Sequence, residues 1–193
     1  MWGQYLLDGI QHITDFNGYD HMVYLIALVC IYDYREWKKV IVLATAFTVG
    51  HSLTLILAGL DVIRPDSGIV EFLIPTTILL TGLTNLRYAK RFKDPVPYHG
   101  MRYVTAIVFG LIHGMGFSSY FRMIVEEGES IVSPLLFFNL GVEVGQLLII
   151  FVFLVLTFFI QSIFRIVQRD WIVFFSGMTV GIAAVICIDT WPF

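Results

Sequence analysis

Residues 133–164 read SPLLFFNLGVEVGQLLIIFVFLVLTFFIQSIF, an apolar run in which Glu143 is the one charged residue. About 20 apolar residues are enough for a helix to cross a bilayer, so this run is long enough to span one. The rest of the chain has the same character: 58% of its 193 residues are hydrophobic, 14% are charged, and the mean hydropathy is +0.80. A water-soluble domain does not have this balance, and the sequence therefore predicts an integral membrane protein.

Further uncharged runs alternate with charged or proline-containing turns along the whole chain. They predict an all-α fold, a polytopic membrane helix bundle of about six transmembrane helices plus an N-terminal interfacial helix, in a single domain over residues 1–193. Residues 1–16 alternate apolar and polar side chains at helical spacing, as expected of a helix that lies in the headgroup region. The six spans are expected near residues 17–33, 37–60, 67–87, 101–124, 133–164 and 171–191.

Positive charge is distributed unevenly between the turns. Ten of the twelve Lys and Arg residues fall in the turns 33–39, 87–102 and 165–170. The positive-inside rule places these turns in the cytoplasm and both termini outside it. The net charge of −3 argues against a nucleic-acid partner, which would need a clustered basic face. The partners that we expect are membrane lipid and a metal ion.

Several ionisable side chains fall inside the predicted spans, in the half next to the outer surface. Only eleven uncharged residues separate Asp20 and His21 from Asp33, so a complete first span draws that pair below the surface. His51, His113 and Glu143 lie deeper in their own spans. Charged or titratable groups at such depth are costly unless they are paired or bind a ligand.

Imidazole and carboxylate groups together suit a divalent first-row metal such as Ni, Co or Zn. Cys30 and Cys187 have no metal-type spacing and are interpreted as apolar packing residues. The candidate metal ligands are His12, Asp20, His21, His51, His113 and Glu143. The supporting polar residues are expected to be Thr48, Ser52, Glu71, Asn139, Gln146 and Asp189.

Five short blocks along nearly the whole chain resemble the HupE/UreJ family of small bacterial membrane proteins. They are GIQH at 9–12, GYDH at 18–21, TAFTVGHSLTL at 45–55, FGLIHGMGF at 109–117 and FNLGVEVGQL at 138–147. The resemblance implies a helical protein of the bacterial inner (cytoplasmic) membrane, and members are generally described as nickel or cobalt permeases. It also implies that His12, Asp20, His21, His51, His113 and Glu143 lie on the metal path.

Three functions remain open from the sequence. The first is a permease that captures a divalent cation from outside through His and carboxylate ligands. The second is an intramembrane zinc-dependent hydrolase, in which three His hold the metal and Glu143 or Asp20 acts as the base. The third is a structural bundle whose buried polar groups only join helices. The spacing of Gly177 and Gly181 permits close helix contact within the chain or in a homo-oligomer.

Overall fold

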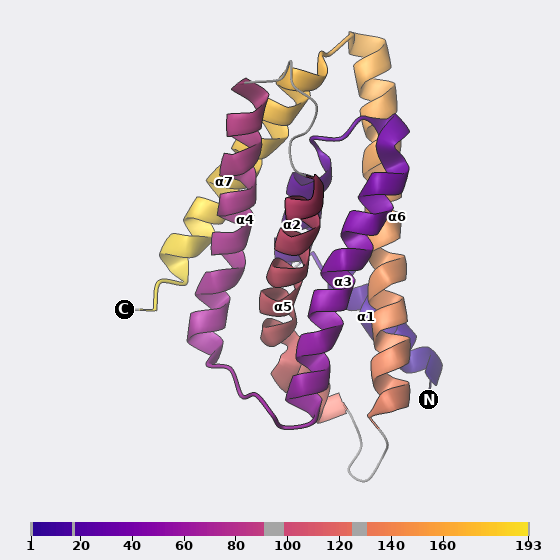
Figure 1. Cartoon of the computed structure of the whole chain (residues 1–193), viewed down its shortest axis with the longest axis vertical. Coiled ribbons are helices and arrows are strands. Elements are labelled where there is room, and N and C mark those ends of the chain that lie inside the picture. The colour runs from indigo at the N-terminus through magenta and orange to yellow at the C-terminus, as the bar shows by residue number, and fades with distance from the viewer. Residues whose placement is uncertain (1, 17, 91–98, 125–130, 193) are drawn as a thin grey trace.

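The computed structural model describes residues 2–16, 18–90, 99–124 and 131–192, and these ranges contain helices and no strand (Figure 1). The predicted all-α fold is therefore confirmed. In chain order the elements are α1 (Trp2–Thr14), α2 (Asp20–Val29), the 3-10 helix η1 (Tyr34–Glu36), α3 (Trp37–Gly59), α4 (Ser67–Lys90), α5 (His99–Ile124), α6 (Val132–Phe164) and α7 (Gln168–Asp189).

Helices α3 to α7 are long and apolar enough to cross a membrane, which makes the chain a membrane helix bundle. Their bounds agree with the last five predicted stretches to within three residues at each end. Successive helices alternate in direction, so that α3, α5 and α7 begin at the end of the bundle where α4 and α6 finish, at the top of Figure 1.

We call this end the basic end because most of the described cations lie there. They are Arg35, Lys38, Lys39, Arg87, Lys90, Arg102, Arg165 and Arg169. Arg91 and Lys93, assigned by sequence to the same side, lie outside the described residues, as do Glu126, Glu127 and Glu129 of the opposite side. The described residues thus preserve the charge asymmetry on which the predicted orientation depends.

The first predicted span was expected near residues 17–33, and residue 17 lies outside the described part. Within residues 18–33 the structure has one helix, α2, of ten residues. At 1.5 Å per residue α2 is about 15 Å long, which is half of the apolar core of a bilayer. Helix α1 has 13 residues and runs parallel to α6, since Leu6 lies beside Gly141 and Ile13 beside Gly145. Helix α2 then continues to the basic end, where η1 and α3 begin.

Helix α1 packs along α6 through glycines on both sides of the contact. A Cβ atom at Gly9 would collide with the carbonyl oxygen of Phe138, and one at Gly141 would collide with that of Leu6. Gly9 and Ile13 are buried in this contact, while Trp2 remains exposed. The predicted interfacial position of α1 stays a prediction, and its C-terminal half is held against the bundle.

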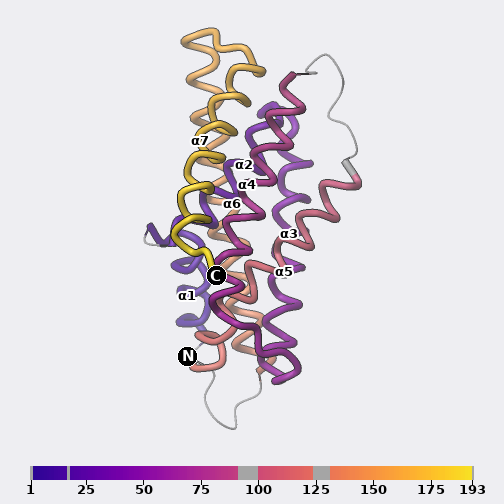
Figure 2. Tube along the Cα trace, turned by 90° about the vertical axis from the view of Figure 1, so that its left-hand side faces the viewer, coloured from indigo at the N-terminus to yellow at the C-terminus, as the bar shows by residue number. Residues whose placement is uncertain are grey.

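Helices α3 and α5 form a second close pair, which lies side by side on the flank of the bundle shown at the right of Figure 2. A Cβ atom at Gly50 would collide with the carbonyl oxygen of Ile107, and one at Gly110 with that of Phe47. The two backbones can therefore approach this closely only because these positions lack side chains.

The outward surface of α6 is apolar along its whole length, as expected where a helix meets lipid tails. Large exposed hydrophobic side chains follow one another on it: Leu136, Leu140, Val144, Leu148, Phe151, Val155 and Phe159. Gly177 and Gly181 of α7 are also exposed, and a Cβ atom at either would meet nothing within 4 Å. Among the residues that the structure describes, this glycine pair packs against no other helix.

Candidate metal centre

Four histidines from four helices meet inside the bundle. His12 lies in the last turn of α1 and His21 in the first turn of α2, on the two sides of the interruption between these helices. His51 comes from α3 and His113 from α5. The break in the N-terminal helix path thus lies where the histidines gather.

The close contact of α3 and α5 brings the two deeper histidines together. Gly110 lies about one turn before His113 and Gly114 directly follows it, and a Cβ atom at Gly114 would lie 2.7 Å from the carbonyl oxygen of His51. His51 and His113 are both completely buried. The glycines that the sequence placed beside His113 therefore serve close helix packing, and this packing positions the imidazoles.

Three of the imidazoles already have the geometry of a ligand group. One ring nitrogen from each of His12, His21 and His51 lies within 4.8 Å of the others. A tetrahedral metal with bonds of 2.0–2.1 Å to nitrogen needs nitrogens about 3.3 Å apart, so the rings would move inward by about 1 Å or less each. Small side-chain rotations are enough for that change.

His113 lies directly beside this group. Its ring centroid is 5.1 Å from that of His21, and its Nε2 atom lies 3.1 Å from the hydroxyl of Thr77 on α4. The hydrogen bond to Thr77 fixes the orientation of the ring and leaves Nδ1 as the other nitrogen. A fourth imidazole is thus available at the edge of the three-histidine group.

Five ring nitrogens of these histidines lack hydrogen-bond partners among the described residues. The atoms concerned are buried: Nε2 of His12, Nε2 of His21, both nitrogens of His51 and Nδ1 of His113. A buried polar atom without a partner costs about 1–3 kcal/mol, and native structures contain few of them. A single divalent metal ion could use one ring nitrogen from each of His12, His21 and His51 as a ligand.

Asp20 supports the group through His21. Its Oδ1 atom lies 3.0 Å from Nδ1 of His21 and accepts a 2.8 Å hydrogen bond from the backbone N–H of the same residue. A carboxylate at Nδ1 fixes the tautomer that leaves Nε2 free as a metal ligand. Asp20 thus lies behind His21, a candidate ligand.

Glu143 lies elsewhere, at the seam between α6 and α3. Its carboxylate accepts hydrogen bonds from the hydroxyls of Thr45 (2.6 Å) and Thr48 (2.5 Å), and Gln146 donates to the Thr48 hydroxyl at 2.5 Å. Glu143 is not a member of the three-histidine group. Thr48 and Gln146, both expected as supporting residues, lie at this contact, and Thr48 joins α6 to α3.

The remaining supporting candidates do not meet the histidines as a set. Asn139 lies beside His51 and donates to the carbonyl of Leu135, whereas Ser52 donates to the carbonyl of Thr48 in its own helix. Glu71 and Asp189 are exposed on α4 and at the end of α7. Sequence reasoning missed Thr77, whose position two residues after Pro75 was the available signal, because hydroxyls often accompany a proline inside a membrane helix.

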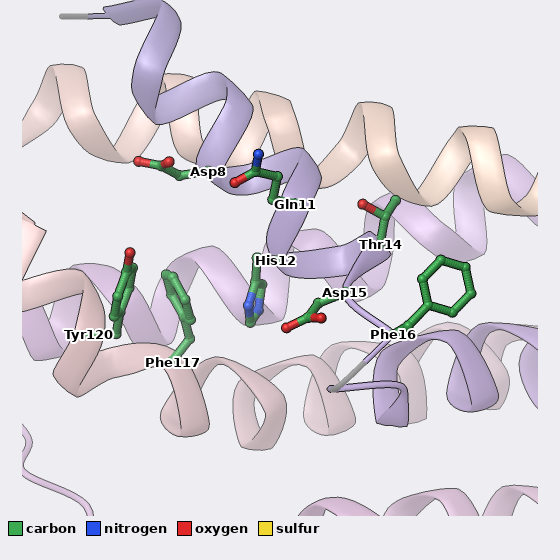
Figure 3. A pocket seen from close by; sticks show the side chains of 8 residues that line it. All are labelled: Asp8, Gln11, His12, Thr14, Asp15, Phe16, Phe117 and Tyr120. Atoms are coloured by element: carbon green, nitrogen blue, oxygen red, sulfur yellow. The ribbon is translucent and has the colours of Figure 1, made fainter.

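A pocket of about 630 Å³ opens beside His12 (Figure 3). Figure 3 shows the His12 ring between α1 and α5, with Asp15 next to it and Asp8 farther along α1. The pocket is lined by Asp8, Gln11, His12, Thr14, Asp15, Phe16, Phe117 and Tyr120. It leads from the surface of the bundle to the edge of the histidine group, the set formed by His12, His21, His51 and His113.

Comparison with known proteins gives one match. The family described as "HupE / UreJ protein" matches residues 1–190, which is nearly the whole chain. No curated protein and no solved structure matches.

Proposed function

The chain belongs to the HupE/UreJ family of membrane proteins, and on this premise we propose that it binds a divalent transition-metal ion at the histidine group and carries it across the membrane. The cargo of the permease is nickel or cobalt, taken up from the side opposite the basic end. We further propose that the protein lies in the bacterial inner membrane with both termini outside the cytoplasm, and the positions of the cations support this orientation.

One observation carries this proposal: buried imidazole nitrogens without partners converge from four helices. Imidazole is the ligand that nickel, cobalt and zinc share, whereas magnesium and calcium prefer oxygen. No cysteine joins the described ligand group, and Cys30 and Cys187 lie in other parts of the bundle. The ligand chemistry therefore supports a borderline divalent metal.

The pocket beside His12 supports entry of the ion from outside. Asp8 and Asp15 place carboxylates on its wall, and carboxylates in a cleft raise the local concentration of cations. An ion that enters here reaches His12 first. Because His12 borders both the pocket and the group, it is the ligand that would transfer the ion inward.

Glu143 serves a different step in this proposal. Since it joins α6 to α3 through Thr45 and Thr48, protonation of its carboxylate would weaken that contact. We assign Glu143 to proton exchange linked to movement of the two helices, and the histidines to metal binding. Asp20 orients His21.

The test compares binding and flux in the same variants. Parent protein, His51→Ala and His113→Ala are purified without a histidine tag and reconstituted into vesicles that contain a nickel-sensitive dye. The parent is expected to carry nickel or cobalt, and both variants to lose at least nine-tenths of that flux. His99→Ala is the control, because position 99 lies 14 residues from His113 on the same helix, about 21 Å away.

An intramembrane zinc hydrolase is the second candidate, because a pocket on one side of three histidines also suits a substrate. That function predicts about one equivalent of zinc that resists chelators, and no flux. A purely structural role predicts that His51→Ala and His113→Ala lower the thermal midpoint while the parent binds no metal.

A further inference from the structure

Between the histidine group and the basic end, α4 carries a buried polar stripe. Thr77, Thr81 and Asn85 follow one another at intervals of four residues and share one helix face. At the end of the stripe next to the histidines Thr77 is hydrogen-bonded to His113, and at the end towards the basic end Asn85 donates to the carbonyl of Ala27 on α2 at 2.6 Å. The stripe thus connects the histidine group to the last turn of α2.

Tyr24 of α2 lies near the end of this stripe that is next to the histidines, beside His113. It follows His21 by three residues on α2, is completely buried, and its ring centroid is 5.1 Å from that of His113. Within the described ranges its hydroxyl has no hydrogen-bond partner. A phenylalanine would fill the same space without a buried, unpaired hydroxyl, so packing alone does not account for a tyrosine here.

Arg102 lies at the end of the stripe towards the basic end. It belongs to the first turn of α5, and its Nη1 atom lies 3.4 Å from Oδ1 of Asn85. No carboxylate forms an ion pair with Arg102 in the part of the chain that the structure describes. Its positive charge is therefore directed into the end of the polar stripe.

We propose that Tyr24, Thr77, Thr81 and Asn85 form the inner half of the route of the divalent cation, and that the Arg102 guanidinium is the gate that closes it. This inference rests on the proposed function. Hydroxyl and carboxamide oxygens bind nickel and cobalt more weakly than imidazole does, so an ion that leaves the histidines is released towards the basic end. A cation next to a guanidinium in a medium of low dielectric constant is strongly repelled. Passage therefore requires Arg102 to move away from Asn85.

The first experiment separates the route from the binding centre. Tyr24→Phe and Arg102→Gln are compared with the parent for nickel binding in detergent and for nickel flux in vesicles. We expect both variants to bind nickel within twofold of the parent. We expect Tyr24→Phe to lose at least tenfold in flux and Arg102→Gln to gain at least threefold.

The controls are Tyr34→Phe at a half-buried position and Arg169→Gln at an exposed position, which change the same residue types at the basic end. Parent-like flux in both Tyr24→Phe and Arg102→Gln would overturn the route and leave the proposed function intact. A parent with no flux at all would overturn the proposed function and the route together.

The second experiment does not depend on how the substitutions fold. Cys30 is completely buried, and its Sγ atom lies 3.7 Å from Nδ2 of Asn85, so it reports on the end of the route nearer the basic end. In a Cys187→Ala variant Cys30 is the single thiol. A small, positively charged thiol reagent applied from the basic end is expected to label Cys30 at least fivefold faster when nickel is present. An unchanged labelling rate would contradict a gate that opens during transport.

Discussion

The Asp20 carboxylate contacts His21 twice, at the ring Nδ1 atom and at the backbone N–H of the same residue. Both contacts use Oδ1, so the carboxylate fixes the ring to the start of α2. The carboxylate that orients the His21 ring thus belongs to its neighbour in the sequence.

Asp20→Asn is expected to weaken metal binding about 10- to 100-fold, the usual effect of removing a group that orients a ligating imidazole. The fold should be retained, since the amide oxygen can still accept the backbone hydrogen bond. Isothermal titration with nickel measures the change. Asp170→Asn, at an exposed position of α7, is the matched control, and equal affinities in the two variants would rule out the role of Asp20.

Glu143→Gln is expected to leave nickel affinity within about threefold of the parent, because Glu143 lies outside the three-histidine group. Flux should fall at least tenfold, since a carboxamide cannot take up and release the proton that the proposed exchange requires. Nickel flux in vesicles tests this. Glu71→Gln on the exposed face of α4 serves as the control. A parallel loss of affinity in Glu143→Gln would instead identify Glu143 as a ligand.

Gly110→Ala is expected to destabilise the protein by about 1–3 kcal/mol or more, because its Cβ atom would meet the carbonyl oxygen of Phe47 and force α3 and α5 apart. The same separation moves His51 away from His113, so metal affinity should decrease as well. Gly177→Ala changes the same residue type where nothing lies within 4 Å and should stay within about 0.5 kcal/mol of the parent. Thermal unfolding in detergent compares the two.

Metal itself should stabilise the fold, since its ligands come from α1, α2, α3 and α5 and the unfolded chain does not hold them together. At a free nickel concentration of 100 times Kd the expected gain is about 2.7 kcal/mol. Unfolding curves with nickel and with a chelator measure it, and His51→Ala should show no such difference. A gain of the same size in His51→Ala would place the bound metal elsewhere.

Most of the bundle could be predicted from the sequence because apolar length decides which segments cross a membrane. The same rule was insufficient at the N-terminus: residues 17–33 contain only the ten-residue α2, and the chain before them supplies a second helix that packs on α6. The number of apolar residues in a segment does not show that two short helices, α1 and α2, follow one another there.

The histidines were identified from their depth, since each titratable side chain in an apolar helix requires a partner or a ligand. Glu143 met the same criterion, yet its partners are two hydroxyls of the neighbouring α3, which donate hydrogen bonds to its carboxylate. Which helix faces Glu143 depends on the glycine contacts between distant segments, and no local pattern specifies those contacts. Tyr24 and Thr77 were missed because a tyrosine or threonine in an apolar helix is unremarkable until its neighbours are known.

The interruption between α1 and α2 has an electrostatic consequence. A helix carries partial negative charge at its C-terminal end and partial positive charge at its N-terminal end. The last turn of α1, which bears His12, therefore directs backbone carbonyl dipoles at the place where a cation would be held. The positive first turn of α2 would repel that cation, and the negative charge of Asp20 lies on this turn to offset it. An uninterrupted helix through the same residues would have neither exposed end, and its backbone would contribute no field at the metal centre.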